Sequence, residues 1–130
     1  MSKKYTVLIV DDDKFLLGMY RKKFEHDGAL VDVAVGSEET LTKLRGGAKP
    51  DIIILDIIMP GMDGLELLKV IRKEKLVPDS IIIMLTNESD QKKIEEAKSL
   101  GIKGYIVKAT SIPTEVVEKV WEIAKLKIEN

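Results

Sequence analysis

Acidic residues stand directly after two short apolar runs of this sequence. The run at residues 5–10 is followed by three aspartates at positions 11–13, and the run at residues 52–55 is followed by Asp56. Short, β-branched runs of this kind are typical of buried strands in a parallel sheet. If the two strands are neighbours, these carboxylates meet at the carboxyl edge of one sheet, where open α/β folds place their sites. Like charges gathered in this way need a cation, and a hard divalent ion with oxygen ligands would favour phosphate chemistry.

Two other polar residues stand at equivalent positions later in the chain. Thr86 follows the apolar run 80–85, and Lys108 follows the run 104–107. A hydroxyl, an ammonium and a carboxylate cluster at one sheet edge form a coherent set for phosphoryl transfer. Carboxylates would hold Mg²⁺, one carboxylate would be the nucleophile, and Thr86 and Lys108 would neutralise charge on the phosphoryl oxygens.

These residues require a frame that brings the strand ends together. Strands are predicted at residues 5–10, 30–35, 51–55, 80–85 and 104–107, and apolar residues at three- and four-residue spacing predict a helix after each. Helix boundaries are indicated by start signals at Ser37, Ser89, Asp90 and Pro113 and by stop signals at Gly28, Gly46, Gly47 and Gly101. Five strand-then-helix repeats predict a three-layer, doubly wound α/β domain with helices on both faces of a parallel sheet.

Length and composition exclude several classes of protein. The 130 residues suffice for one domain, and 33% charged residues with a net charge of -1 argue against a general nucleic-acid or anionic-membrane surface. The sequence has no cysteine, so disulfides and thiolate chemistry are excluded. No apolar run approaches the roughly 20 residues needed to span a bilayer, and the first residues do not resemble a signal peptide. A cytoplasmic domain is expected.

Four segments of the chain, in order and at the usual spacings, resemble a two-component response-regulator receiver domain. They are VLIVDDD at residues 7–13, LDIIMPGMDG at 55–64, LT at 85–86 and YIVK at 105–108. The resemblance covers nearly the whole chain and implies a flavodoxin-like five-stranded sheet in the order 2-1-3-4-5. It also implies one receiver domain over residues 1–130, similar to stand-alone chemotaxis regulators, with no output domain in this chain. Two alternatives are left open: a stand-alone regulator and a receiver excised from a longer protein.

The resemblance assigns roles to the residues at the sheet edge. Asp56 corresponds to the phospho-acceptor, and Asp12 to a direct ligand of the cofactor Mg²⁺. Asp11 corresponds to the carboxylate that holds the ion mainly through water, and the backbone carbonyl of Ile58 to the main-chain metal ligand. Asp13 has no assigned role, and capping of the first helix is its expected use.

Three further residues are assigned to charge balance and switching. Lys108 corresponds to the lysine that pairs with a phosphoryl oxygen and, before phosphorylation, with the acceptor carboxylate. Thr86 corresponds to the hydroxyl that responds to the phosphoryl group, and Tyr105 to the aromatic switch residue whose ring turns inward when the threonine moves. His26 is interpreted as a surface histidine, and the phenylalanines and Trp121 as packing residues.

The sequence departs from the family pattern at three positions. Ala109 stands where proline commonly follows the lysine, often after a cis peptide bond. Because a non-proline cis bond costs about 2.5–4 kcal/mol, either the Lys108–Ala109 bond is trans and the loop differs, or the local fold sustains the strain. Ile58 and Asn87 are bulkier or less polar than usual, and both border the expected route of a hydrolytic water.

The resemblance implies a phosphorylation-controlled switch rather than an enzyme with an external substrate. The domain would take a phosphoryl group from a sensor histidine kinase or phosphotransfer protein and catalyse only its own phosphorylation and dephosphorylation. The surface of the fourth helix, last strand and last helix would then contact a downstream protein, with the domain a monomer or a phosphorylation-dependent dimer. Neither nucleic acid nor a membrane is expected to bind directly.

Other classes fit the sequence less well. A haloacid-dehalogenase phosphatase would need an acid, a spacer, a second acid and a threonine or serine after the first strand, but here Asp13 is followed by Lys14, Phe15 and Leu16. A flavodoxin would need a phosphate-binding loop rich in serine, threonine and glycine where the acidic triplet stands. A phosphate-relay intermediate and a phosphorylation-independent adaptor of the same fold remain as alternatives.

Overall fold

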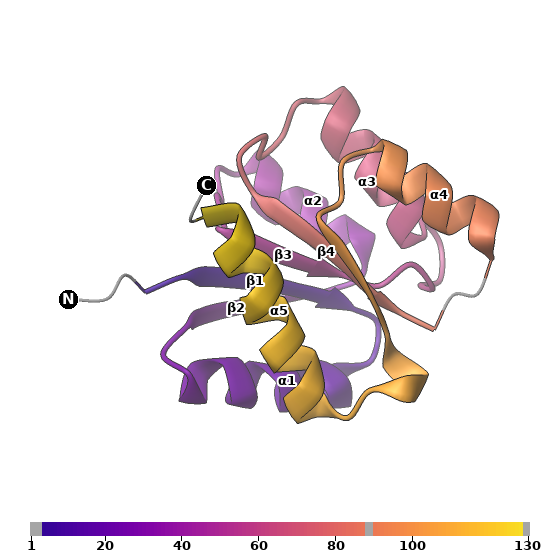
Figure 1. The fold of residues 1–130 in the computed structure, drawn as a ribbon. Helices are drawn as coiled ribbons and strands as arrows, with labels where there is room; N and C mark the ends of the chain where they lie inside the picture. The colour runs from indigo at the N-terminus through magenta and orange to yellow at the C-terminus, as the bar shows by residue number, and fades with distance from the viewer. Residues whose placement is uncertain (1–3, 88–89, 129–130) are drawn as a thin grey trace.

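The structure is a computed structural model, and it describes residues 4–87 and 90–128. Five parallel strands form one sheet in the order β2-β1-β3-β4-β5, with helices on both of its faces (Figure 1). The strands are β1 (Thr6–Asp11), β2 (Leu30–Val35), β3 (Ile52–Leu55), β4 (Ile81–Thr86) and β5 (Gly104–Val107). The predicted doubly wound fold and the strand order are confirmed.

The helices divide between the two faces of the sheet and leave an apolar layer on each side. They are α1 (Lys14–His26), α2 (Ser37–Arg45), α3 (Gly64–Lys73), α4 (Gln91–Ser99) and α5 (Pro113–Ile128), and a 3₁₀ turn spans Lys108–Thr110. Side chains of α1 and α5 pack in one core cluster, and those of α2, α3 and α4 in the other (Figure 1). Successive strand residues point to opposite faces of the sheet, so Ile54 packs in the cluster of α1 and α5, and Leu55 packs in the cluster of α2, α3 and α4.

Aromatic side chains close the seam between α1 and α5. Trp121 packs edge-on against Phe24, with ring centroids 5.5 Å apart, and tilted against Tyr5 at 5.9 Å. Its indole N–H donates to Asp27 beyond the end of α1, at 2.9 Å. Trp121 is therefore a packing residue, as predicted, with a polar contact at the rim.

The expectation for Phe15 is wrong, because its side chain is 77% exposed. The buried face of α1 is formed by Leu17, Tyr20 and Phe24, and Phe15 lies outside that stripe. His26 is exposed, as predicted.

Two kinds of boundary differ from the prediction. Two strands, β1 and β4, run one residue further toward the site, because the backbone continues to pair after the side chains become polar: the N–H of Gly36 donates to the carbonyl of Asp11 at 3.2 Å. Ser37 is not the N-cap of α2. Gly36 is, and the Ser37 hydroxyl donates to the carbonyl of Met62 at 2.8 Å. The start signal predicted at Ser89 lies outside the described residues.

Candidate phospho-acceptor site

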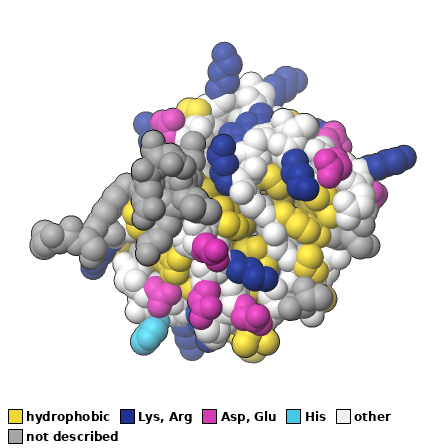
Figure 2. Space-filling view, in the orientation of Figure 1, with side chains coloured by type: hydrophobic (Ala, Val, Ile, Leu, Met, Phe, Trp, Pro, Cys, Tyr) yellow, Lys and Arg dark blue, Asp and Glu magenta, His cyan; other side chains and the backbone are white. Residues whose placement is uncertain are grey.

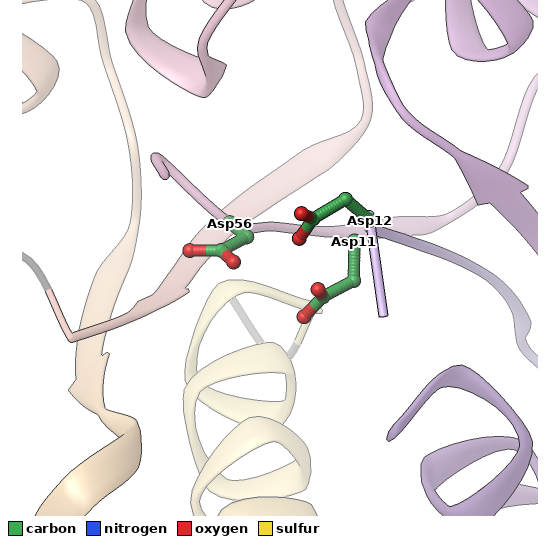
Figure 3. Close-up of side chains that lie close together, drawn as sticks. All are labelled: Asp11, Asp12 and Asp56. Atoms are coloured by element: carbon green, nitrogen blue, oxygen red, sulfur yellow. The ribbon is translucent and has the colours of Figure 1, made fainter. Parts of the chain in front are cut away.

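Two adjacent strands place three carboxylates at the carboxyl edge of the sheet. Val10 of β1 lies opposite Leu55 of β3, so the aspartates that follow them come side by side. The N–H of Asp56 still donates to the carbonyl of Val10, at 3.1 Å, which ties the start of the loop to β1. Oxygens of Asp11, Asp12 and Asp56 all lie within 4.8 Å of one another (Figure 3).

The three carboxylates differ in exposure. Asp11 and Asp56 are buried, at 3% and 5% exposure, whereas Asp12 is exposed. The pKa of Asp12 is raised by partial burial, by its hydrogen bond with Asp11 and by the negative charges of Asp11 and Asp56. Ionisation of Asp12 is opposed by the neighbouring carboxylates, and a divalent cation would relieve this repulsion. The clustered carboxylate oxygens are also the ligands that a hard divalent cation prefers.

Lys108 supplies the one positive charge that the structure shows inside this cluster. Its ammonium lies 2.6 Å from Asp11 Oδ2 and 2.9 Å from Asp56 Oδ2, and its side chain is 12% exposed. Burial by itself lowers the pKa of Lys108, but the hydrogen bonds and charges of Asp11 and Asp56 outweigh it and raise the pKa. Lys108 is therefore protonated and bridges the two buried carboxylates.

The chain around Lys108 accommodates Ala109 without a cis peptide bond. The Lys108–Ala109 bond is trans, and the 3₁₀ turn follows directly after β5. Of the two possibilities left open by the sequence, the trans loop is the one observed.

The loop after Asp56 is held tightly against the strand end. The N–H of Ile58 donates to Asp56 Oδ1 at 3.2 Å, and the N–H of Gly64 donates to the carbonyl of Ile57 at 2.8 Å. A Cβ atom on Gly64 would collide with the backbone carbonyl of Asp56. Asp63 caps α3 through the N–H of Glu66, so the loop passes directly into a well-formed helix.

Thr86 and Tyr105 occupy one face of the sheet beside this cluster. Thr86 is fully buried at the end of β4, and Tyr105 is partly buried against the core cluster of α2, α3 and α4. Tyr105 lies opposite Met84, two residues before Thr86 on the same side of the strand. The two side chains are therefore diagonal neighbours, as a coupled pair would require.

The sequence did not predict two features of the site. The Lys108–Asp11 contact joins β1 to β5, which β3 and β4 separate, so no local pattern signals it. The close fit of Gly64 against Asp56 is also a tertiary contact. The one local signal for it is the Asp63-Gly64 pair at the start of an apolar helix, which is typical of a close approach between two backbone segments. Asp13 caps α1 through the N–H groups of Phe15 and Leu16, as expected.

Comparison with known proteins identifies the class. The family model described as "Response regulator receiver domain" matches residues 7–120. The chain is 36% identical over 114 residues to the transcriptional regulatory protein ResD of Bacillus subtilis, covering 88% of this chain and 45% of ResD. The chain therefore belongs to the response regulator receiver family. It is a receiver domain of the two-component type and spans about half the length of the curated relatives that it matches.

Solved structures support the same family. A CheY-like receiver domain protein from Methanospirillum hungatei superposes with a TM-score of 0.85 at 28% identity, covering 98% of this chain and 100% of the other. TrrA from Thermotoga maritima, solved in complex with Mg(2+)-BeF, has a TM-score of 0.75 at 34% identity, covering 92% and 98%. Receiver domains are signalling phospho-acceptors and bind Mg²⁺ at an aspartate cluster. Among the described residues, no helix is long and apolar enough to cross a membrane.

The fit of Gly64 generates a test of the acceptor loop. Gly64→Ala should lower the free energy of unfolding by about 1–3 kcal/mol, because the new methyl group meets backbone that cannot rotate away. Gly104→Ala is the matched control, since its methyl group would meet the Ile123 side chain, most closely at its flexible end, rather than backbone. Urea unfolding measures both. Equal losses in the two variants would contradict the tight passage at Gly64.

Proposed function

We propose that this domain accepts a phosphoryl group on Asp56 from a phosphohistidine of a sensor kinase or phosphotransfer protein. The observation that carries the proposal is the buried Asp56 carboxylate, joined to the Lys108 ammonium and flanked by Asp11 and Asp12. The transfer would form a bond between an Asp56 oxygen and phosphorus as the phosphorus–nitrogen bond of the donor breaks. The donor imidazole would leave with the electron pair of that bond and regain a proton from solvent.

Asp11, Asp12, Asp56 and the backbone carbonyl of Ile58 would hold Mg²⁺ in this chain. Their oxygen atoms are the ligands that this ion prefers, and the three carboxylates already lie together. When bound, the ion supplies neutralisation of charge on the phosphoryl oxygens. Lys108, which now bridges Asp11 and Asp56, would turn its ammonium to a phosphoryl oxygen and so change partners during the reaction.

The new charge on Asp56 would act on the switch residues. The Thr86 hydroxyl would move toward the phosphoryl group, and the ring of Tyr105 would occupy the space vacated beside it. The surface formed by α4, β5 and α5 would change as a result and signal to a downstream protein. That surface carries charged side chains of both signs with apolar surface between them, which suits a protein partner (Figure 2).

Exposed apolar side chains support a protein as the donor. Phe15, Ile58, Met62 and Ile112 are 77%, 53%, 36% and 61% exposed, and all four follow the carboxyl ends of strands. They therefore lie on the edge that carries Asp56, and we name them the apolar rim. A donor protein that presents a phosphohistidine to the buried Asp56 would cover the rim and remove its apolar surface from water.

The proposal includes two further properties. The domain would catalyse the loss of its own phosphoryl group, and it would work in the cytoplasm. The absence of a membrane-spanning helix among the described residues and the cysteine-free sequence are compatible with that location. A phosphate-relay intermediate is the second candidate, because Asp56 and Lys108 serve equally in a domain that passes the phosphoryl group onward. An adaptor that works without phosphorylation is less favoured, since it has no need of a complete carboxylate and lysine set.

The acceptor is tested by labelling with acetyl phosphate and Mg²⁺. The parent should gain the mass of one phosphoryl group, and Asp56→Asn should gain none, because the amide is not a competent nucleophile. Asp13→Asn is the control, since asparagine also caps helices, and it should label like the parent. Undiminished labelling of Asp56→Asn would show that another residue is the acceptor.

The metal site is tested by the stability of Asp12→Ala. Because the pKa of Asp12 is raised in the folded state, its charged form opposes folding at neutral pH, and that cost disappears below the ordinary pKa. In EDTA at pH 7 the variant should unfold at the same temperature as the parent or higher, and Mg²⁺ should raise the melting temperature of the parent alone. A large loss of stability in EDTA would mean that Asp12 is a structural acceptor.

The apolar rim is tested by separating two phosphoryl donors. The donor should be the histidine kinase that phosphorylates the parent at the highest rate. Phe15→Ala should lower the rate of transfer from this kinase about tenfold, the effect of losing ~1.4 kcal/mol of contact free energy. Labelling by acetyl phosphate should be unchanged. Leu30→Ala is the control, because Leu30 is 54% exposed at the opposite edge of the sheet. Equal kinase rates for the parent and Phe15→Ala would exclude the rim as the docking surface.

A further inference from the structure

Few apolar contacts attach α4 to the rest of the domain. Of its nine residues, Ile94 and Ala97 are buried, and most of the others are charged. Its backbone lies closest to α3, which runs beside it in front of the same face of the sheet (Figure 1). Because so little apolar surface fixes α4, the polar contacts with α3 have a large share in setting its position.

The carboxyl-terminal half of α4 is held by two cations of α3. Lys69 Nζ lies 2.7 Å from Glu96 Oε2, but the two side chains are 49% and 45% exposed, so this pair adds little to the attachment. Arg72 Nε donates to the carbonyl of Leu100 at 2.7 Å, and its Nη2 donates to the carbonyl of Gly101 at 3.5 Å. A guanidinium on the last carbonyls of a helix satisfies acceptors that have no partner within the helix, and it complements the negative end of the helix dipole.

The chain beyond α4 is fixed as well. Ile102 packs against the core, and the N–H of Lys103 donates to the carbonyl of Ile82 in β4, at 2.8 Å. The carboxyl-terminal end of α4 is therefore anchored both to α3 and to the sheet.

The amino-terminal half of α4 has a looser link to α3. Lys93 Nζ lies 3.8 Å from Asp63 Oδ2, and the two side chains are 40% and 25% exposed. Asp63 Oδ1 accepts from the N–H of Glu66, so one carboxylate both caps α3 and faces α4. Asp63 also directly precedes Gly64, which rests on the backbone of Asp56. Lys93 thus contacts the loop that begins at the acceptor.

We propose that α4 is hinged on α3, with the Arg72 contacts as the pivot and the Asp63–Lys93 ion pair as a latch on the movable end. This inference rests on the proposed function, since the latch responds to the state of Asp56. In the resting protein the latch holds the amino-terminal half of α4 against α3. A change at Asp56 reaches Asp63 through the short loop and weakens the latch, and α4 then turns about its anchored end.

The hinge gives the acceptor a second route to α4, separate from Thr86. Thr86 lies buried at the end of β4, whereas Asp63 contacts α4 from the surface between two helices. Because an exposed ion pair is weak, its removal should shift the resting equilibrium by about two- to fivefold and should leave the fold intact.

The latch is tested with beryllofluoride and Mg²⁺ as the probe of the active state. Lys93→Ala should bind beryllofluoride about two- to fivefold more tightly than the parent, because the latch opposes the active state. Lys98→Ala is the matched control: it removes the same charge from α4, but Lys98 pairs with Glu95 of its own helix. The gain should fall in 1 M NaCl, which screens the latch. If the loss of one positive charge were all that mattered, both variants would bind the anionic beryllofluoride more weakly than the parent, and the latch would be refuted.

The pivot is tested by amide hydrogen exchange along α4. Lys93→Ala without ligand should speed exchange in residues 94–96 and leave residues 99–102 unchanged. Arg72→Ala should speed exchange in residues 99–102, and Arg72→Lys, which keeps the charge but loses the two-pronged donor, should lie between that variant and the parent.

Two results would overturn the hinge. Equal beryllofluoride affinity and exchange in Lys93→Ala and Lys98→Ala would eliminate the latch, and a uniform response of α4 to beryllofluoride in the parent would eliminate the pivot. A parent that does not bind beryllofluoride would instead refute the proposed function and the hinge with it. The two failures are therefore distinguishable.

Discussion

The ion pairs of Lys108 with Asp11 and Asp56 are the interaction on which the site depends. Two buried carboxylates at hydrogen-bonding distance from one ammonium satisfy charges that would otherwise oppose folding. The same arrangement allows the pairing of the Lys108 ammonium to change. Any added anion on Asp56 competes for the same ammonium, and any added cation beside Asp11 replaces part of what the ammonium supplies. The chemistry and the electrostatic balance of the resting fold therefore involve the same atoms.

The sheet makes this balance possible because its central strands are buried on both faces. All four residues of β3 are buried, so Asp56 leaves the sheet from a rigid platform rather than from a mobile loop. Helices on opposite faces then have different tasks. Those on the side of α1 and α5 form a compact aromatic seam, whereas α4 on the other side is thinly attached and polar. Under the proposed hinge, α4 would therefore move more readily than the helices of the aromatic seam.

The sequence predicted the fold and the polar residues that gather at the edge of the sheet, because both follow from local sequence patterns. Alternating strands and helices define the architecture, and polar residues directly after strands must gather at one edge. Contacts decided by tertiary structure could not be predicted. The hydroxyl of Ser37 bonds to Met62 instead of capping its own helix, Phe15 is turned out of the core by the choice of buried face on α1, and Lys108 reaches Asp11 across two intervening strands. The assigned roles of Asp56, Thr86 and Tyr105 in phosphorylation remain predictions.

The position of Trp121 has a spectroscopic consequence. The chain has one tryptophan, and its partly buried indole contacts Phe24, Tyr5 and Asp27 on the face of the sheet opposite α4. Its fluorescence therefore reports whether α1 and α5 are docked and is largely insensitive to movements of α4. A native-like emission spectrum can therefore accompany either position of α4, whereas a change in the packing of α5 would alter the spectrum directly.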